Sequence, residues 1–173
     1  CFGLPVLSPV HGQVARVCDH LADNAPGDVD ARNNWGNFVL VRLDSGLHVL
    51  LAHLRQHSVR VKESEWIVPG KLLASCGNSG RSPQPHLHLQ VQRSPQLGSA
   101  TEAFHLCSLL RHEGNGASEY LVNARPQVGD TLEAAVVDPR LATPLHLPVG
   151  RQFTYRVEGE GLPPDTLRHL QVE

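Results

Sequence analysis

Apolar and polar residues alternate along several short stretches of this chain, and a period of two is typical of β-strands. Residues 4–18 alternate around a Pro-Val-His-Gly turn and predict a first hairpin. Residues 38–43 and 47–53, separated by the turn Asp44-Ser-Gly46, predict a second hairpin rich in β-forming side chains. Residues 58–62 form a third alternating run. The pattern predicts a mainly β protein built from antiparallel strands.

The same signals continue towards the middle of the chain. Residues 66–70 and 71–76 predict strands joined by a Pro-Gly turn, and a glycine-bracketed turn follows at residues 77–80. A further strand is predicted from His86 to Gln92, just after a proline. Its alternation places one set of side chains on one face, namely His86, His88 and Gln90, and another set on the opposite face, namely Leu87, Leu89 and Val91.

The composition changes after this strand, and the change suggests how the chain is divided. We expect a main module over residues 1–95, a linker or short helix over 96–119, and a small β-rich unit over 120–173. Residues 100–111 fit a helix or a strand equally well. Two later stretches read as strands, namely 131–137 and 152–157.

Overall composition narrows the functional classes. The chain has 173 residues, of which 40% are hydrophobic and 18% charged, so it is globular rather than disordered. Its formal net charge is -2 without basic blocks, which argues against a nucleic-acid partner. Residues 19–35 are rich in Asp, Asn, Gly and Pro and predict a long exposed loop of the kind that borders sites. Its Trp35 would either wall a groove for peptide or glycan or cover the core.

Missing features are informative as well. The chain contains no methionine, so we expect a fragment whose natural N-terminus, with any signal, span or further domain, lies upstream. It carries no apolar run of the roughly 20 residues that a membrane span needs. The four cysteines form no Cys-x-x-Cys pair, which argues against a zinc finger or a thioredoxin-like motif. Buried single thiols are expected, with one disulfide as the alternative and its pairing open.

Candidate chemistry lies in the histidines. In a strand, His86 and His88 project to the same side, about 6 to 7 Å apart, so one can bind a metal while the other reaches a metal-bound water or a substrate. His11 and His20, near an acidic loop, form a weaker local candidate for a metal site and fit solvated turns better. The remaining histidines are expected to be structural or on the surface: His48, His57, His105, His112, His146 and His169.

The segment Gly77-Asn-Ser-Gly80 followed by Pro85-His-Leu-His88 resembles the C-terminal motifs of the lysostaphin-type, LytM-like murein endopeptidases of peptidase family M23. Upstream, Leu51-Ala-His53-Leu is similar to the family's Tyr-Ala-His segment, and Leu7-Ser-Pro-Val-His-Gly12 is similar to its Ala-Pro hairpin. Val61-Lys62 and Pro69-Gly70 occupy the expected intermediate places. The order is kept across residues 4–92, while Leu51, Leu89-Gln90 and Ser64-Glu65 depart from the usual residues.

The resemblance implies an antiparallel sheet or open barrel-like peptidase module of the duplicated hybrid motif type. It also implies that His88 is a zinc ligand and that His53 and His86 act as general base and oxyanion stabiliser beside the zinc-bound water. The family's other two ligands, a His and an Asp, would precede Cys1. We therefore expect these 173 residues alone to be inactive.

Several functions stay open from the sequence. The first is a zinc-dependent endopeptidase that acts on bacterial cell-wall peptides in the cell envelope or periplasm. The second is a non-enzymatic degenerate module that binds the wall or regulates another wall enzyme. A third reading is a lipoyl-carrier or phosphotransferase barrel, where His86 or His88 would carry a phosphate. Residues 40–92 also resemble peptidase modules attached to bacterial membrane-transport domains.

Overall fold

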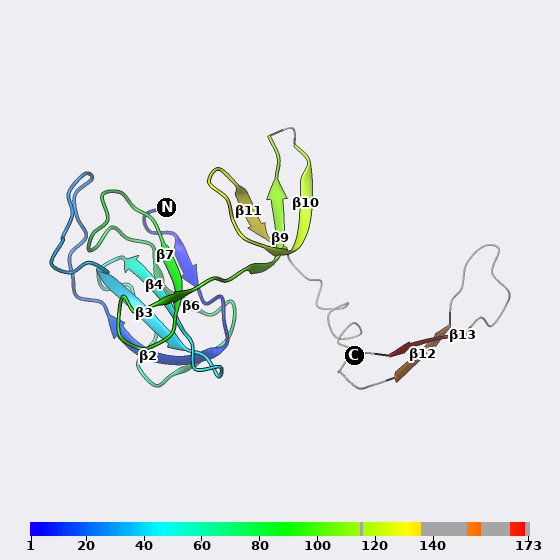
Figure 1. Ribbon diagram of the computed structural model, residues 1–173. Helices are drawn as coiled ribbons and strands as arrows, with labels where there is room; N and C mark the ends of the chain where they lie inside the picture. The colour runs from blue at the N-terminus through cyan, green and yellow to red at the C-terminus, as the bar shows by residue number, and fades with distance from the viewer. Residues whose placement is uncertain (115, 136–151, 157–166, 172–173) are drawn as a thin grey trace. The chain divides into compact units, whose positions relative to one another are not determined.

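The protein is described by a computed structural model that covers residues 1–114, 116–135, 152–156 and 167–171, the last two ranges by their backbone. The chain forms two compact units, Cys1–Phe104 and His105–Glu173 (Figure 1). Strands and turns account for the described residues, without a helix, which confirms the mainly β class. In these ranges there is accordingly no helix long and apolar enough to cross a membrane.

The first unit is built on one antiparallel sheet. Its strands run, in spatial order, β5 (Trp66–Ile67), β2 (Gly12–Cys18), β3 (Asn37–Arg42), β4 (His48–Leu54), β7 (His88–Gln92) and β8 (Thr101–Glu102). The predicted second hairpin is confirmed, since β3 pairs with β4 in a register that sets Val41 opposite Val49. Strands β5 and β8 are the two edges, so the sheet is open rather than a closed barrel (Figure 1).

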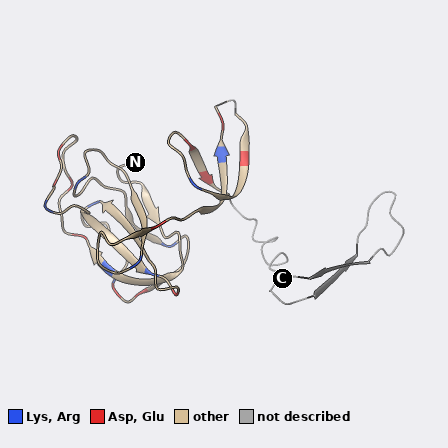
Figure 2. Cartoon of the chain, in the orientation of Figure 1, with Lys and Arg blue, Asp and Glu red and all other residues tan. Residues whose placement is uncertain are grey.

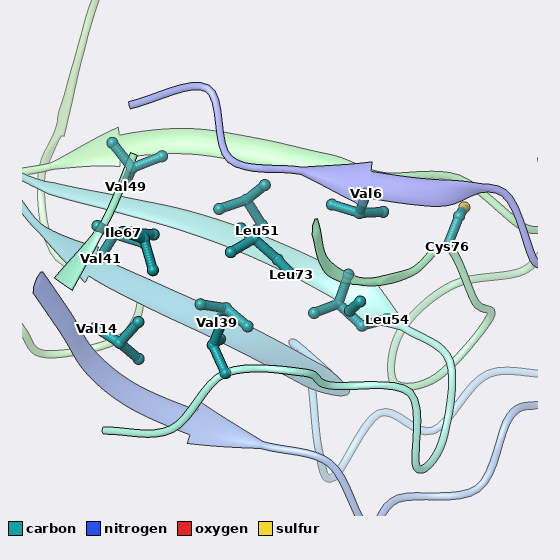
Figure 3. Packing of buried hydrophobic residues seen from close by; sticks show 12 residues of the cluster. Val6, Val14, Val39, Val41, Val49, Leu51, Leu54, Ile67, Leu73 and Cys76 are labelled. Carbon is teal, nitrogen blue, oxygen red and sulfur yellow. The ribbon is translucent and has the colours of Figure 1, made fainter. Parts of the chain in front are cut away.

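A two-stranded antiparallel layer covers one face of this sheet. It consists of β1 (Pro5–Leu7) and β6 (Leu72–Ser75). Val6 and Leu73 from this layer pack against Val39, Val41 and other apolar side chains of the sheet, all almost completely buried (Figure 3). Burial of apolar surface between the two layers is the main source of stability for this unit.

A smaller apolar cluster lies on the other face of the sheet. Phe38 and Leu40 from β3 pack there with Leu50 and Ala52 from β4, and Trp35 covers part of the group. Strands β3 and β4 are therefore buried on both faces. This explains their nearly continuous apolar runs, which a strand with one wet face would not have.

The expected first hairpin is wrong in its pairing. The two strands exist, but β1 pairs with β6, while β2 pairs with β3 and β5. Local alternation predicts strands but not their partners. Here β1 pairs with β6 in the second layer, where Val6 packs against the sheet. The turn between the strands keeps Ser8 bound to Val10, with the hydroxyl donating to the Val10 carbonyl at 2.8 Å.

Residues 58–62 are not a strand, contrary to expectation. The backbone amides of Ser58 and Val59 donate to a side-chain oxygen of Asp19, at 3.0 and 3.2 Å, in place of ladder hydrogen bonds. Strand β7 also begins two residues later than predicted, at His88. His86 precedes it, because the segment with Pro83 and Pro85 lacks two backbone donors.

The second unit contains a three-stranded sheet and a separate hairpin. In the sheet, β9 (Leu106–His112) lies between β10 (Ser118–Ala124) and β11 (Thr131–Ala134). Strands β12 (Gln152–Arg156) and β13 (Leu167–Gln171) pair with each other. The segment expected as a linker or short helix, 96–119, contains β8, β9 and the start of β10. The ends of the expected strands 131–137 and 152–157, at residues 136, 137 and 157, lie outside the described residues, as does His146.

Acidic and basic residues are interspersed along both described units rather than gathered in blocks (Figure 2). Exposed ion pairs such as Arg93 with Glu102 join neighbouring strand ends. Exposed pairs of this kind contribute little to stability, typically below about 1 kcal/mol each.

Two loops of the first unit, one just before β3 and the other after β6, pack backbone against backbone. Gly36, just before β3, and Gly80, after β6, both have left-handed φ angles, +59° and +79°. A Cβ atom on Gly80 would collide with the backbone of Gly36, and one on Gly36 would collide with the backbone of Ser79. The sequence therefore needs glycine at both positions for close approach as well as for conformation.

We predict that Gly80→Ala destabilises the first unit by several kcal/mol, because it adds a backbone collision to the roughly 1–2 kcal/mol penalty for a left-handed residue. Gly70→Ala is the matched control, since Gly70 has a similar φ of +83° but open space around it. Urea unfolding of both variants measures the difference. Equal losses would show that close packing at Gly80 is not required.

We also predict that buried His48 weakens the fold in acid. Burial lowers the pKa of His48 below its ordinary 6.5, the charge of Arg42 lowers it further, and a backbone interaction with Gly46 opposes this in part. Nδ1 of His48 is buried without a hydrogen-bond partner. The unfolded chain therefore binds a proton at this residue more readily, so the free energy of unfolding falls as the pH drops below about 6.5. In His48→Leu, urea unfolding at about pH 7 and 5 should show a smaller difference. An unchanged difference would contradict this assignment.

Candidate active site

Three imidazoles gather where β4 ends and β7 begins. The ring centroid of His53 lies 4.7 Å from that of His86 and 5.9 Å from that of His88. Strands β4 and β7 are neighbours, with Ala52 opposite His88, so the pairing itself brings His53 close to the Pro-His-Leu-His segment. His53 is buried, and the other two are half-buried. The structure therefore brings together all three histidines singled out in the sequence.

His53 is held in an unusual backbone conformation. Its φ of 61° is left-handed, which costs a non-glycine residue roughly 1–2 kcal/mol. Two backbone hydrogen bonds hold it there: the His53 amide donates to the Trp35 carbonyl at 3.2 Å, and the Gly77 amide donates to the His53 carbonyl at 3.0 Å. Backbone strain of this kind is concentrated at functional sites.

The His53 side chain is fixed in one tautomer. Nδ1 lies 2.8 Å from the carbonyl oxygen of Ser79, which only accepts, so the imidazole donates Nδ1–H and keeps a lone pair on Nε2. Burial lowers the pKa of His53, the hydrogen bond to Ser79 opposes this, and His86 and His88 lower the pKa further. His53 is therefore a neutral base near neutral pH.

His86 is oriented by the turn that precedes it. Its Nδ1 lies 2.9 Å from the carbonyl oxygen of Gln84 and 3.1 Å from the hydroxyl of Ser82. The carbonyl can only accept, so Nδ1 carries the proton and Nε2 is free to accept one or to bind an electrophile. Ser82 is completely buried and is itself anchored on Asn78 at 2.8 Å.

A chain of side-chain amides fixes His88. The Gln92 amide nitrogen lies 2.6 and 3.0 Å from the carbonyl oxygens of Ser94 and Gln96, so its oxygen must face Gln90. The Gln90 nitrogen donates to that oxygen at 2.9 Å, which turns the Gln90 oxygen towards Nε2 of His88 at 2.8 Å. His88 must therefore donate from Nε2, which leaves the lone pair on Nδ1.

Trp35 contacts His88 and also lines a cavity. Its ring meets that of His88 edge-on with the centroids 5.1 Å apart, and it also lines a cavity of about 460 Å³. The same lining includes Arg16 from β2, Arg32 from the loop expected to border the site, and Phe38 from the smaller apolar cluster. Both roles considered for Trp35 are compatible with this geometry, since Trp35 lines the cavity and also covers part of the core.

The described residues do not complete a metal site. Across the part of the chain that the structure describes, no group of three or more His, Cys, Asp or Glu side chains is arranged to hold a metal ion. His88 has a free lone pair on Nδ1, and its second nitrogen is bound to Gln90, as is usual for a metal-ligating histidine. His88 suits a zinc site, but a catalytic zinc ion needs about three protein ligands.

The alternative local site near His11 and His20 does not form. His11 stacks on Trp66 with the ring centroids 5.4 Å apart, whereas His20 lies beside Cys18. Asp23 of this loop holds the backbone instead, since it accepts from the backbone amides of Gln56 and Asn78, at 3.0 and 2.7 Å, as Asp19 does from Ser58. These carboxylates cap turns of the backbone.

Ser79, Gln90 and Gln92 were not assigned roles from the sequence, although they position the site. The alternation along β7 did place Gln90 on the same face as His88, and that signal could have identified it. Ser79 is a completely buried polar residue in an irregular turn. Burial cannot be predicted from sequence in such a turn, so no signal pointed to Ser79.

We predict that Gln92→Leu releases the tautomer of His88. Without the Gln92 oxygen, the Gln90 amide can turn its nitrogen towards His88, so both ring tautomers become populated. Two-bond proton–nitrogen NMR correlations of the metal-free protein report the protonated ring nitrogen directly. Gln13→Leu, at a partly exposed glutamine in β2, is the control and should leave the His88 pattern unchanged. A mixture already present in the unsubstituted protein would contradict the amide chain.

Comparison with known proteins supplies the family. A model of peptidase family M23 matches residues 2–101, which is more than half of the chain. No curated protein sequence matches the chain significantly.

Similar solved structures have low sequence identity to this chain. A structure of LytU is 23% identical over 58% of this chain and 61% of its own, with a TM-score of 0.46. The catalytic domain of lysostaphin from Staphylococcus simulans is 20% identical over 59% and 68%, with a TM-score of 0.45. A zinc-containing peptidase from Vibrio cholerae is 27% identical over 53% and 24%, with a TM-score of 0.42.

The chain thus spans less than two thirds of the LytU and Vibrio cholerae chains, and these TM-scores lie below 0.5. The assignment therefore rests on the match to the family model across nearly all of the first unit. This chain belongs to peptidase family M23.

Proposed function

We propose that the natural protein is a zinc-dependent endopeptidase that cleaves peptides of the bacterial cell wall. The proposal is carried by one observation: His53, His86 and His88 meet at one end of the sheet, each with one ring nitrogen bound to an acceptor and the other free. Family membership supports a peptidase, and imidazole groups in this arrangement suit a hydrolytic site.

Zinc fits this proposal through His88. Nδ1 of His88 would bind the metal, while Gln90 holds Nε2–H and keeps the ring in place. Two further ligands would come from the segment expected before Cys1. When bound, zinc supplies a water of lowered pKa and polarises the scissile carbonyl.

His53 and His86 have the roles of proton carrier and charge stabiliser. In His53, the lowered pKa keeps the ring unprotonated near neutral pH, so the free Nε2 can accept a proton from the attacking water. Nε2 of His86, once protonated, can donate a hydrogen bond to the oxygen that becomes negative during attack on the peptide carbonyl. The two roles are interchangeable on this geometry, since both rings present Nε2.

The cavity beside Trp35 suits an extended peptide. Trp35 and Phe38 provide apolar contact, and Arg16 and Arg32 provide positive charge for carboxylates of the substrate. Wall peptides carry both features, and such a substrate would place the protein in the cell envelope.

The second candidate function is a non-enzymatic degenerate module that binds the wall or regulates another wall enzyme. It is favoured by the residues near the histidines that depart from the family's usual ones, Leu51 and Leu89-Gln90. Such a module would keep the sheet and the cavity, and the histidines would be remnants.

The test is made on protein expressed from its natural start. We predict about one zinc per chain by elemental analysis, lost in His88→Ala and retained in His11→Ala, an exposed histidine of the β1–β2 turn. The unsubstituted protein should hydrolyse cell-wall peptides, and chelation should abolish hydrolysis.

A second pair of variants separates the metal from the proton chemistry. His53→Gln and His86→Gln should keep zinc and lose roughly 10²- to 10⁴-fold in kcat. Zinc well below one per chain in the unsubstituted protein would exclude the catalytic proposal and favour the degenerate module. Phosphorylation of His86 or His88 that survives chelation would favour the phosphotransferase alternative.

A further inference from the structure

The sulfur atoms of Cys1 and Cys76 lie unusually close together. Their Sγ atoms are 2.9 Å apart, although the residues are 75 positions apart in sequence. Even carbon atoms rest at about 3.5–4.0 Å in non-bonded contact, and sulfur is larger. The distance is intermediate between a non-bonded contact and the roughly 2.05 Å of a covalent S–S bond.

The surrounding backbone holds these two cysteines in place. The Gly3 amide donates to the Cys76 carbonyl at 2.8 Å, and the Cys76 amide donates to the Leu4 carbonyl at 2.8 Å. These bonds extend the β1–β6 pairing to Cys76, and the Leu4 amide also donates to the Cys1 carbonyl at 3.0 Å. A crosslink here would therefore need little backbone movement, which is the main requirement for a stable disulfide.

The other two cysteines are engaged elsewhere. The Cys18 thiol contacts the side-chain oxygen of Asn37 at 3.8 Å, and the Cys107 thiol, in the second unit, contacts that of Asn123 at 3.2 Å. Of the pairings that the sequence left open, the structure favours the one between Cys1 and Cys76.

We propose that Cys1 and Cys76 form a disulfide that ties the start of the first unit to the base of the histidine cluster. Cys76 precedes Gly77, whose amide binds the His53 carbonyl. The Cys1 thiol also lies 3.3 Å from the carbonyl oxygen of Pro85, next to His86. The crosslink would join the segments that hold two of the three histidines, and it does not depend on catalysis.

Figures 1 and 3 show where the two cysteines lie in the first unit, through the marked N-terminus and the labelled Cys76. The N-terminus lies near the segment that leads into β7 (Figure 1), in agreement with the contact to Pro85. Cys76 lies beside Val6 of β1 at the end of the apolar cluster (Figure 3). Cys76 is thus in the core, at 3% exposure, whereas Cys1 is an exposed residue.

The oxidation needs a disulfide donor, either oxidised glutathione or a protein of the thiol–disulfide oxidoreductase class. Exposed Cys1 attacks first as a thiolate, forms a mixed disulfide and releases one donor thiol. Burial raises the pKa of the Cys76 thiol, which makes it the second participant. The Cys76 thiolate then attacks the Cys1 sulfur and releases the second donor thiol. Two protons leave the protein, and two electrons pass to the donor.

The first test maps the crosslink on the full, unsubstituted protein after incubation with oxidised glutathione. The protein is denatured, alkylated without reduction and digested with trypsin. We expect the peptide carrying Cys1 joined to residues 72–81, lighter by two hydrogens than the sum of the free peptides. Alkylation of both cysteines before reduction, or a crosslink that joins another pair, would overturn the proposal.

The second test measures what the crosslink does. Reduction of the oxidised protein should lower Tm by on the order of 10 °C, because the crosslink closes a long loop. In Cys1→Ser, reduction should leave Tm unchanged, whereas Cys107→Ser should behave as the unsubstituted protein does. A crosslinked protein whose Tm does not respond to reduction would refute the structural role. The mapping needs no variant, so a variant that fails to fold leaves the proposal testable.

Discussion

The hydrogen bonds of one buried residue, Ser79, connect the sheet to the histidine cluster. Its carbonyl accepts from His53 at 2.8 Å, its hydroxyl donates to the Leu54 carbonyl at 2.7 Å, and the Asn37 amide donates to the same hydroxyl at 2.9 Å. One residue therefore joins the start of β3 and the end of β4 to the turn after β6. A buried polar group has to be paired, so movement of any of these segments would leave several groups unpaired together.

The strands could be read from the sequence better than their partners. Alternation predicted β3, β4 and most of β7, because each strand has its own local pattern. Alternation predicted β1 as a strand but not its partner. The partner, β6, is set by the need to cover the sheet, and a short stretch of sequence does not contain that constraint. Alternation failed at residues 58–62, where the Asp19 side chain takes the amides that a strand would have used.

The site was predictable to a similar degree. His86 and His88 were found from their His-x-His spacing and His53 from the resemblance of its segment to a family motif, and the structure brings the three together. Their roles are a separate matter from their proximity. What the sequence could not provide was the direction of each hydrogen bond. The tautomer of His88 depends on backbone carbonyls six and eight residues away, through two amides whose orientation is only apparent in three dimensions.

The pairing of β1 with β6 also has a consequence for the order of folding. The β3–β4 hairpin closes a short loop, whereas β1 must find a partner about 70 residues away, as Val6 does with Ala74. Contacts between distant residues carry a larger entropic cost and form more slowly. The sheet is therefore expected to assemble first, and the β1–β6 layer to close over it late. Until then one apolar face of the nascent sheet stays open to solvent, and the newly made chain is at its most prone to aggregate during that interval.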